Sequence, residues 1–242
     1  MAYGARGAYV KERQVDRTEV KRGRWRDATV VRRYGHPPYP VAVIHGGPGA
    51  GGEMAPVARV LSGRQGVLEP IQTADSVEGQ VDELREVLFL EADLPAVLVG
   101  YSWGAWLGFI LSARHPGVVR KLILVSSGPF RDQDATGIRA TRMGRLTKDE
   151  REEFQRAQAA LSHGKAEYRD AALARLGELA GKADAYDPLP EPPGESILPD
   201  ATIFERVWRE AAALRRRGEL LGLGRGIRCP VVAIHGDHDP HP

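Results

Sequence analysis

The chain has 242 residues, of which 42% are hydrophobic and 27% are charged, and its formal net charge at pH 7 is +2. This length and balance fit one large soluble globular domain, and the small net charge argues against a dedicated nucleic-acid binder because no strong field would attract phosphates. No apolar stretch reaches the roughly 18 residues that a membrane-spanning helix needs. The single cysteine, Cys229, cannot form an internal disulfide, so we expect a reducing, cytoplasmic location.

The N-terminal segment carries the excess of positive charge. Residues 1–33 hold ten Lys or Arg against four Asp or Glu. The stretches AYVKERQV (8–15) and DATVVRRYG (27–35) predict two strands of an antiparallel edge hairpin. Because the segment contains acidic residues and lacks an apolar core, it does not fit a targeting peptide. We expect a solvated, Arg-rich edge.

Four apolar runs follow, at residues 41–45, 96–100, 122–126 and 231–235. None alternates with polar residues, which is typical of strands buried on both faces of a parallel sheet. Residues 77–88 carry apolar side chains at helical spacing, and residues 103–113 are apolar on nearly all sides. Strands that alternate with helices predict an α/β fold with helices on both faces of the sheet.

The region after the third run has a different character. Residues 131–182 are charged and predict helices at 149–161 and 168–179, and a proline-rich loop, DPLPEPPGESILPD (187–200), follows. The strand pattern resumes at residue 230. We therefore expect a single domain over residues 1–242 with a helical lid inserted at about 131–205.

A serine between two glycines joins the second apolar run to the apolar helix. The stretch GYSWG (100–104) fits G-x-S-x-G, and its strand–turn–helix setting is the one that a nucleophilic serine requires. The sharp turn lifts the side chain of Ser102 above the sheet, the glycines permit close approach, and the helix N-terminus favours negative charge. The alternative is a serine that merely caps a buried helix.

A glycine-rich loop, HGGPGAGG (45–52), follows the first apolar run. Such loops expose backbone amides, which can bind either a phosphate or the oxyanion of an acyl-transfer reaction. The loop matches neither G-x-x-x-x-G-K-[ST] nor G-x-G-x-x-G in register with the next helix. Together with the serine turn, this favours an oxyanion hole.

HGGPG followed about fifty residues later by GYSWG resembles the α/β-hydrolase superfamily, and within it the proline iminopeptidase-like branch. The resemblance covers most of the chain. It implies that the amides of Gly47 and Trp103 form the oxyanion hole and that the Gly47–Pro48 bond is cis. It also implies that Asp239, in the turn GDHD (236–239), is the catalytic acid.

The chain departs from the family pattern in two places. VLEPIQTADSVEGQ (67–80) stands where many relatives carry D-x-R-G-x-G. Peptidase members also hold the free amino group of the substrate with lid carboxylates, and none of Glu150, Glu152, Glu153 and Glu167 can be matched to that role. Aminopeptidase activity therefore stays open beside ester hydrolysis.

The catalytic base is the missing part of the pattern. In this superfamily the order is Ser, acid, His, and the histidine follows a further strand, whereas this chain stops three residues after Asp239. We expect a chain truncated before the final strand, the histidine and the closing helix. Among the histidines present, His241 is the best candidate base. It lies two residues after Asp239, and residues i and i+2 of an extended segment share a face about 6.6 Å apart, so the two side chains can be in contact.

The segment HGDHDPH (235–241) also permits a second interpretation as a divalent-metal site, but its spacing supports no closed ligand set. We expect neither a metal nor an organic cofactor. The resulting hypothesis is a serine hydrolase that cleaves an ester or amide bond of a small substrate through an acyl-enzyme on Ser102. The alternatives are an inactive relative that binds a ligand or partner, a lyase or perhydrolase built on the same residues, and a structural protein that binds through its basic N-terminal segment. We expect no nucleic-acid or membrane partner, and the oligomeric state stays open.

Overall fold

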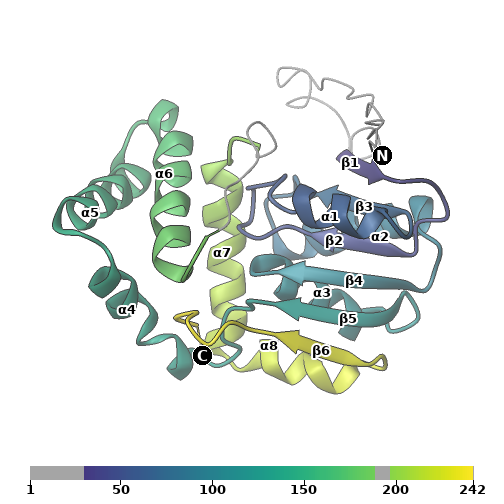
Figure 1. Cartoon of the computed structure of the whole chain (residues 1–242). Coiled ribbons are helices and arrows are strands. Elements are labelled where there is room, and N and C mark those ends of the chain that lie inside the picture. The colour runs from purple at the N-terminus through teal and green to yellow at the C-terminus, as the bar shows by residue number, and fades with distance from the viewer. Residues whose placement is uncertain (1–29, 189–196, 242) are drawn as a thin grey trace, which may run out of the picture.

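The computed structural model describes residues 30–188 and 197–241 (Figure 1). Within these residues one sheet has the strand order β1-β3-β2-β4-β5-β6. Strand β1 pairs with β3 in the antiparallel direction, and the other pairs are parallel. The strands are β1 (Val30–Tyr34), β2 (Val41–Ile44), β3 (Val67–Ile71), β4 (Ala96–Tyr101), β5 (Val119–Val125) and β6 (Val231–Ile234).

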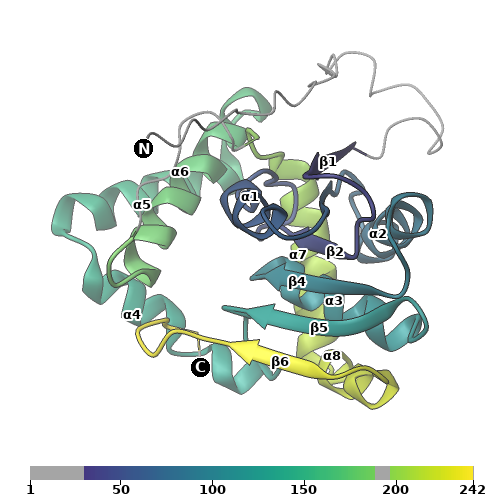
Figure 2. The same cartoon turned by 45° about the vertical axis from the view of Figure 1, so that its right-hand side comes forward.

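Helices cover both faces of this sheet (Figures 1 and 2). Val41 and Val43 of β2 pack against α1 (Ala55–Ser62), whereas Ala42 and Ile44 face the layer of α2 (Val77–Glu91) and α3 (Trp103–Arg114). Alternate residues of one strand therefore supply two cores, as the geometry of a strand requires. The predicted α/β class and the helices expected at 77–88 and 103–113 are confirmed.

The four predicted runs all form strands, but the expectation of burial on both faces is wrong for the last of them. Strand β6 lies at the edge of the described sheet and pairs with β5 alone. Its side chains are exposed, with Val231 at 44% and Ile234 at 56%. A continuous apolar run does not distinguish an edge strand from a central one, because pairing partners and covering helices come from elsewhere in the chain.

The opposite edge is formed by β1, within the stretch predicted as a strand at 27–35, while the strand expected at 8–15 lies outside the described residues. Its partner β3 was not recognised from the sequence, because Glu69 and Pro70 interrupt the apolar pattern. Glu69 is buried, accepts a hydrogen bond from the Tyr34 hydroxyl at 2.7 Å and lies 3.6 Å from the Arg32 guanidinium. Burial raises the pKa of Glu69, and these two partners oppose that shift.

The segment between β5 and β6 is helical and extends beyond the carboxyl ends of the strands (Figure 1). It contains η2 (Asp132–Ala135), α4 (Ile138–Arg145), α5 (Lys148–His163), α6 (Ala166–Asp184), α7 (Ala201–Arg216), α8 (Glu219–Gly222) and η3 (Leu223–Gly226). We refer to α4, α5 and α6 as the lid helices. Helix α7 differs from them, because Val207 and Ala211 lie in the core beside α3 and Trp208 stacks on Trp106 at 5.6 Å.

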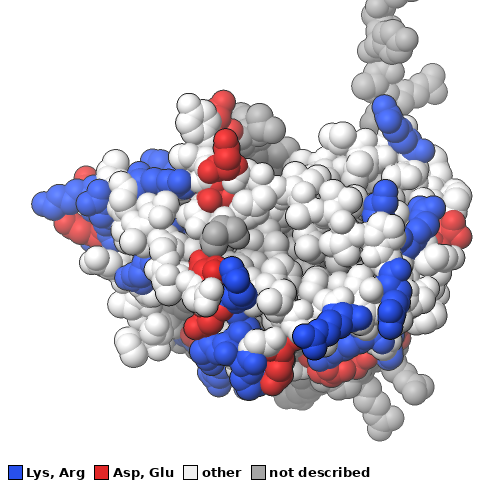
Figure 3. All heavy atoms as spheres, turned by 90° about the horizontal axis from the view of Figure 1, so that it is seen from below, with Lys and Arg blue, Asp and Glu red and all other residues white. Residues whose placement is uncertain are grey.

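Charged side chains of both signs lie next to one another around the edge of the face seen from below (Figure 3). Ion pairs such as Arg217–Glu219, at 2.5 Å, and Arg131–Asp134, at 2.7 Å, are of this exposed kind. Exposed pairs of this type each contribute about 0–1 kcal/mol to stability. No helix among the described residues is long and apolar enough to cross a membrane.

Candidate active site

Ser102 occupies a strained turn between β4 and α3. Its backbone angles are φ 51° and ψ −111°, in a region that residues with a Cβ rarely adopt. The turn is held by the Ser102 N–H, which donates to Val125 O at 3.0 Å, and by Ser102 O, which accepts from the Ala105 N–H at 3.1 Å. Strain that the surrounding structure maintains is concentrated at functional sites. Ser102 is therefore the first candidate for a reacting group.

The two glycines beside this serine allow three segments to cross closely. A Cβ on Gly100 would lie 2.3 Å from Gly104 O, and a Cβ on Gly104 would lie 2.3 Å from Ile44 O. Both contacts are with backbone atoms, which cannot move aside without shifting an element. The glycines of G-x-S-x-G are therefore required where β2, β4 and α3 meet, and the turn predicted from the sequence is present.

The glycine-rich loop after β2 borders Ser102. A Cβ on Gly46 would lie 3.1 Å from the Cβ of Ser102. The Gly46 N–H donates to the Glu53 carboxylate, so this amide already has an acceptor. The amide of Gly47 follows it, in a residue with φ 48°, and Trp103 begins α3, where helix N–H groups have no acceptor within the helix. The structure thus brings together the loop and the helix N-terminus that were predicted to supply the oxyanion donors.

The peptide bond expected to be cis in this loop is not. The cis peptide bonds among the described residues are Pro37–Pro38 and Leu94–Pro95. The Gly47–Pro48 bond is trans, so that feature of the resemblance does not carry over to this chain.

His45, the residue before the two glycines, is a buried support for the loop. Its Nε2 accepts the Gln72 N–H at 3.3 Å, and its Nδ1 lies 2.8 Å from Gly46 O. This pairing requires a neutral imidazole with the proton on Nδ1. Burial lowers the pKa of His45 to about 4, which keeps it neutral near pH 7.

Asp239 and His241 meet in the turn that follows β6. Oδ1 of Asp239 lies 2.6 Å from Nδ1 of His241 and accepts the backbone N–H of His241 at 3.0 Å. Burial acts to raise the pKa of Asp239, but the hydrogen bonds and charge of His241 and the charge of His235 outweigh it, and that pKa is lowered. Asp239 is therefore an ionised hydrogen-bond acceptor for an imidazole, as the acid of a serine–histidine site must be.

The other imidazole nitrogen of His241 faces the lid. Its Nε2 lies 3.3 Å from Nη2 of Arg142 in α4, whose guanidinium makes two hydrogen bonds, at 2.7 and 2.5 Å, to Asp184 at the end of α6. Within residues 30–188 and 197–241, no hydrogen bond joins the Ser102 hydroxyl to a histidine. The structure thus pairs His241 with Asp239 but does not join it to Ser102.

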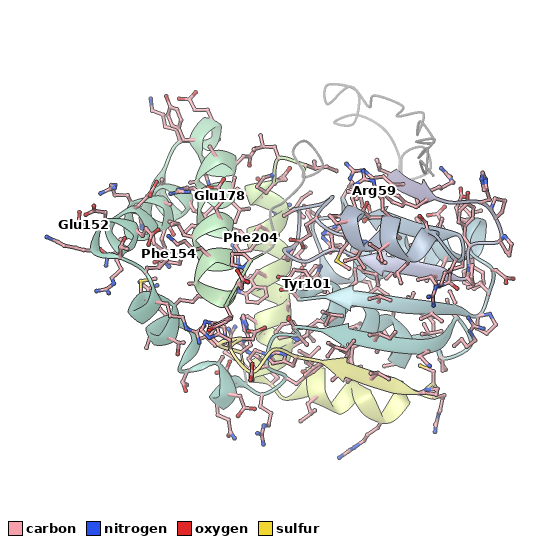
Figure 4. The ribbon with its side chains drawn as sticks, in the orientation of Figure 1. Arg59, Tyr101, Glu152, Phe154, Glu178 and Phe204 are labelled. Atoms are coloured by element: carbon pink, nitrogen blue, oxygen red, sulfur yellow. The ribbon has the colours of Figure 1, made fainter. Side chains whose placement is uncertain are left out.

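Tyr101 shows that charges from several segments gather over the end of β4. Burial, together with the charges of Glu53, Asp184 and Asp239, raises the pKa of its phenol to about 12, while the charge of Arg142 opposes this shift. Figure 4 places Tyr101 at the end of β4 that faces the lid helices. Arg142 and Asp184 were not found from the sequence, because single charged residues on polar helices carry no signal of what they face.

Two of the lid glutamates considered from the sequence, Glu150 and Glu153, are engaged within the lid. Glu150 caps α5 through Thr147 and pairs with Lys182, and the Arg175 guanidinium donates to Glu153 at 2.8 Å. Glu152 points outward from α5 (Figure 4). Asp184 is the lid carboxylate that Arg142 joins to His241.

The remaining histidines lie in other settings. His235 Nε2 lies 2.6 Å from His241 O, His115 ends α3, and His163 is exposed at the end of α5. His238 packs edge-on against Tyr186, with 5.3 Å between the ring centroids. Within the described part of the chain, no group of three His, Cys, Asp or Glu side chains could hold a metal ion.

Comparison with known proteins places this arrangement in context. No curated protein sequence matches the chain. Among solved structures, VinJ is similar over 87% of this chain and 78% of its own, with a TM-score of 0.58 and 21% identity. Proline iminopeptidase from Mycobacterium smegmatis is similar over 87% and 78%, with a TM-score of 0.53 and 16% identity.

A third solved structure, from a study of carboxylesterases of Nitrososphaera gargenis, is similar over 86% of this chain and 76% of its own, with a TM-score of 0.55 and 16% identity. At these identities the likeness concerns the fold. The sequence model of the alpha/beta hydrolase fold family matches residues 90–241, which include the serine turn, the helical insertion and the Asp239 turn. The chain therefore belongs to the alpha/beta hydrolase fold family.

Proposed function

We propose that the protein is a serine hydrolase that cleaves an ester or amide bond of a small substrate through an acyl-enzyme on Ser102. The observation that carries this proposal is the strained backbone of Ser102, held at the start of α3 with Gly46 against its side chain. A hydroxyl in that position is adjacent to backbone N–H groups that can donate hydrogen bonds to the negative charge developing on a substrate oxygen. Family membership and the esterase, peptidase and thioesterase titles among the similar structures agree with hydrolysis.

In the proposed reaction the Ser102 hydroxyl attacks the carbonyl carbon, and the imidazole of His241 takes the hydroxyl proton. The carbonyl oxygen becomes an oxyanion that accepts hydrogen bonds from the amides of Gly47 and Trp103. The intermediate collapses as the carbon–leaving-group bond breaks, and the imidazolium gives its proton to the departing alcohol or amine. Water then attacks the acyl-enzyme with the same base, which releases the acid and restores Ser102.

Asp239 has the role of the orienting acid. Its carboxylate accepts a hydrogen bond from Nδ1–H of His241. This favours the tautomer with a lone pair on Nε2, which is the one that a general base needs. Arg142 donates toward that same Nε2. The proposal therefore requires α4 to move away from His241 so that Nε2 can reach Ser102.

A second candidate function is binding without catalysis. It is favoured by one observation: the Arg142 guanidinium contacts Nε2 of His241, the nitrogen that would have to act as the base. In that case Ser102 and the glycine-rich loop would line a binding site for an ester or amide ligand without reacting with it.

Labelling with a fluorophosphonate, read by intact mass, separates the two functions. The serine hydrolase should gain one phosphonyl group, and the Ser102→Ala variant should gain none. Ser112→Ala is the matched control, because Ser112 lies in the same helix and donates to Gly108 O at 2.7 Å. A folded wild-type chain that gains no adduct would reject the hydrolase and favour the binder.

A further inference from the structure

The segment that leads into α7 lies along the glycine-rich loop. The Ile197 N–H donates to Gly51 O at 2.8 Å, and the Asp200 N–H donates to Gly49 O at 2.9 Å. These bonds join residues about 150 positions apart in the sequence. The loop beside Ser102 is therefore fixed from outside by the chain that returns from the lid.

Two glycines of the loop are needed for this contact. A Cβ on Gly49 would lie 2.8 Å from Asp200 O and 3.0 Å from the Cβ of Ile203, and Gly49 has φ +77°. A Cβ on Gly51 would lie 2.9 Å from Ile71 and 3.4 Å from Ile197. Within HGGPGAGG, Gly46 thus borders Ser102, whereas Gly49 and Gly51 make room for the segment that leads into α7.

The start of α7 is held in turn by the lid. Oδ1 of Asp170, in α6, accepts the Ala201 N–H at 2.8 Å. Ala201 is 1% exposed and packs with Leu161 and Leu173 of the lid helices. Asp200 caps α7 by accepting the N–H groups of Thr202 and Ile203 at 2.8 and 3.0 Å, so the helix has a fixed first turn.

A continuous path therefore runs from the lid to the loop: a hydrogen bond joins Asp170 in α6 to Ala201, the backbone joins Ala201 to Asp200, and a second hydrogen bond joins Asp200 to Gly49. Gly47 completes the path, because its carbonyl accepts the Ala50 N–H at 2.9 Å in the same turn. An oxyanion donor is effective only when its N–H lies at hydrogen-bond distance from the position that the oxyanion will occupy. Small displacements of that amide reduce the reaction rate far more than they reduce substrate binding.

We propose that Asp170 is a positioning residue that sets the Gly47 amide through the start of α7. The proposal rests on the proposed function, since it assigns a role in the same reaction. It also has a consequence that does not depend on activity: removal of the Asp170 acceptor loosens the loop at residues 45–52.

Three variants test this role. Asp170→Leu removes the acceptor, Asp170→Asn keeps an Oδ1 acceptor for the Ala201 N–H, and Glu205→Gln is the matched control. Glu205 pairs with Arg169 and so joins α6 to α7 without contacting the loop. We expect Asp170→Leu to lower kcat for p-nitrophenyl acetate by roughly tenfold to a hundredfold, with KM within about twofold. We expect Asp170→Asn and Glu205→Gln to stay close to wild type.

Hydrogen exchange of the peptide that covers residues 45–52 is the second readout. Asp170→Leu should exchange faster there than wild type, and the other two variants should not. A wild-type exchange rate in Asp170→Leu, an unchanged kcat in an active protein, or an equal loss in Glu205→Gln would overturn the positioning role. If the wild-type chain neither hydrolyses the ester nor reacts with a fluorophosphonate, the proposed function fails, while the exchange data still decide whether Asp170 holds the loop.

Discussion

Nδ1 of His241 lies 2.6 Å from Oδ1 of Asp239, and the backbone N–H of His241 donates to the same oxygen at 3.0 Å. Two bonds from one residue to one carboxylate oxygen fix both the position of the segment and the orientation of the imidazole. Asp239 follows β6, whose carboxyl end is paired with that of β5. The imidazole is therefore held at the carboxyl ends of the parallel strands, where Ser102 also lies.

This pairing predicts that His241 activates Ser102. His241→Gln should lower the rate of fluorophosphonate labelling by about 10³, because a serine hydroxyl without a base is a weak nucleophile. His238→Gln is the matched control, since His238 lies in the same turn but packs on Tyr186. A His241→Gln variant that reacts as fast as wild type would show that the base is another group.

The contact of Arg142 with Nε2 gives a second prediction. Arg142→Met keeps the length of the side chain and removes the donor, so the lone pair of Nε2 becomes available and labelling of Ser102 should be several-fold faster. Arg139→Met is the matched control, because Arg139 lies one turn earlier in α4 and donates to Gln158 at 2.9 Å. Slower labelling in Arg142→Met would mean that Arg142 supports the site instead of blocking it.

The serine turn and its loop could be predicted from the sequence, because local chemistry determines them. A buried strand, a serine between glycines and an apolar helix are consecutive in the chain, and the steric need for Gly100 and Gly104 does not depend on distant residues. The partnership of Asp239 with His241 was predictable for the same reason, since the two residues are separated by one position.

The rest of the site depends on contacts between distant segments. Arg142, Asp184 and Asp170 are charged residues on polar helices, and such residues usually face solvent, so nothing in their own neighbourhood marks them. Strand β3 was missed because Glu69 and Pro70 break its pattern, although Tyr34 on the neighbouring strand donates a hydrogen bond to Oε2 of the buried carboxylate. In each case the partner that gives the residue its role lies dozens of positions away.

The glycines differ in how much space surrounds them, and this predicts opposite effects on stability. Gly104→Ala should lower the free energy of unfolding by at least about 1–3 kcal/mol, because the new Cβ would meet Ile44 O at 2.3 Å and His45 O at 2.6 Å. Gly177→Ala, in the middle of α6, has nothing within 4 Å of its Cβ and should raise that free energy by about 0.5–1 kcal/mol. Urea denaturation of both variants measures the difference, and equal effects would contradict the close crossing at Gly104.

His45 predicts how stability depends on pH. Its pKa in the folded protein is about 4, against an ordinary value of 6.5, because burial disfavours the charged imidazole. As the pH falls through 6.5 the unfolded chain binds a proton that the folded protein does not, so the free energy of unfolding decreases. The decrease should continue to about pH 4 and then stop, since both states are protonated below it, and it should amount to about 3 kcal/mol.

Urea denaturation at intervals between pH 7 and pH 4 measures this slope, and His45→Gln should flatten it whatever its effect on stability at pH 7. His163→Gln, at the exposed end of α5, should keep the wild-type slope. Carboxylates with lowered pKa values act in a separate window: Glu150, whose pKa is lowered to about 2 by its bonds with Lys182 and Thr147, loses its contribution only below about pH 4.5. A His45→Gln variant with the wild-type slope between pH 6.5 and pH 4.5 would therefore show that burial does not hold His45 neutral.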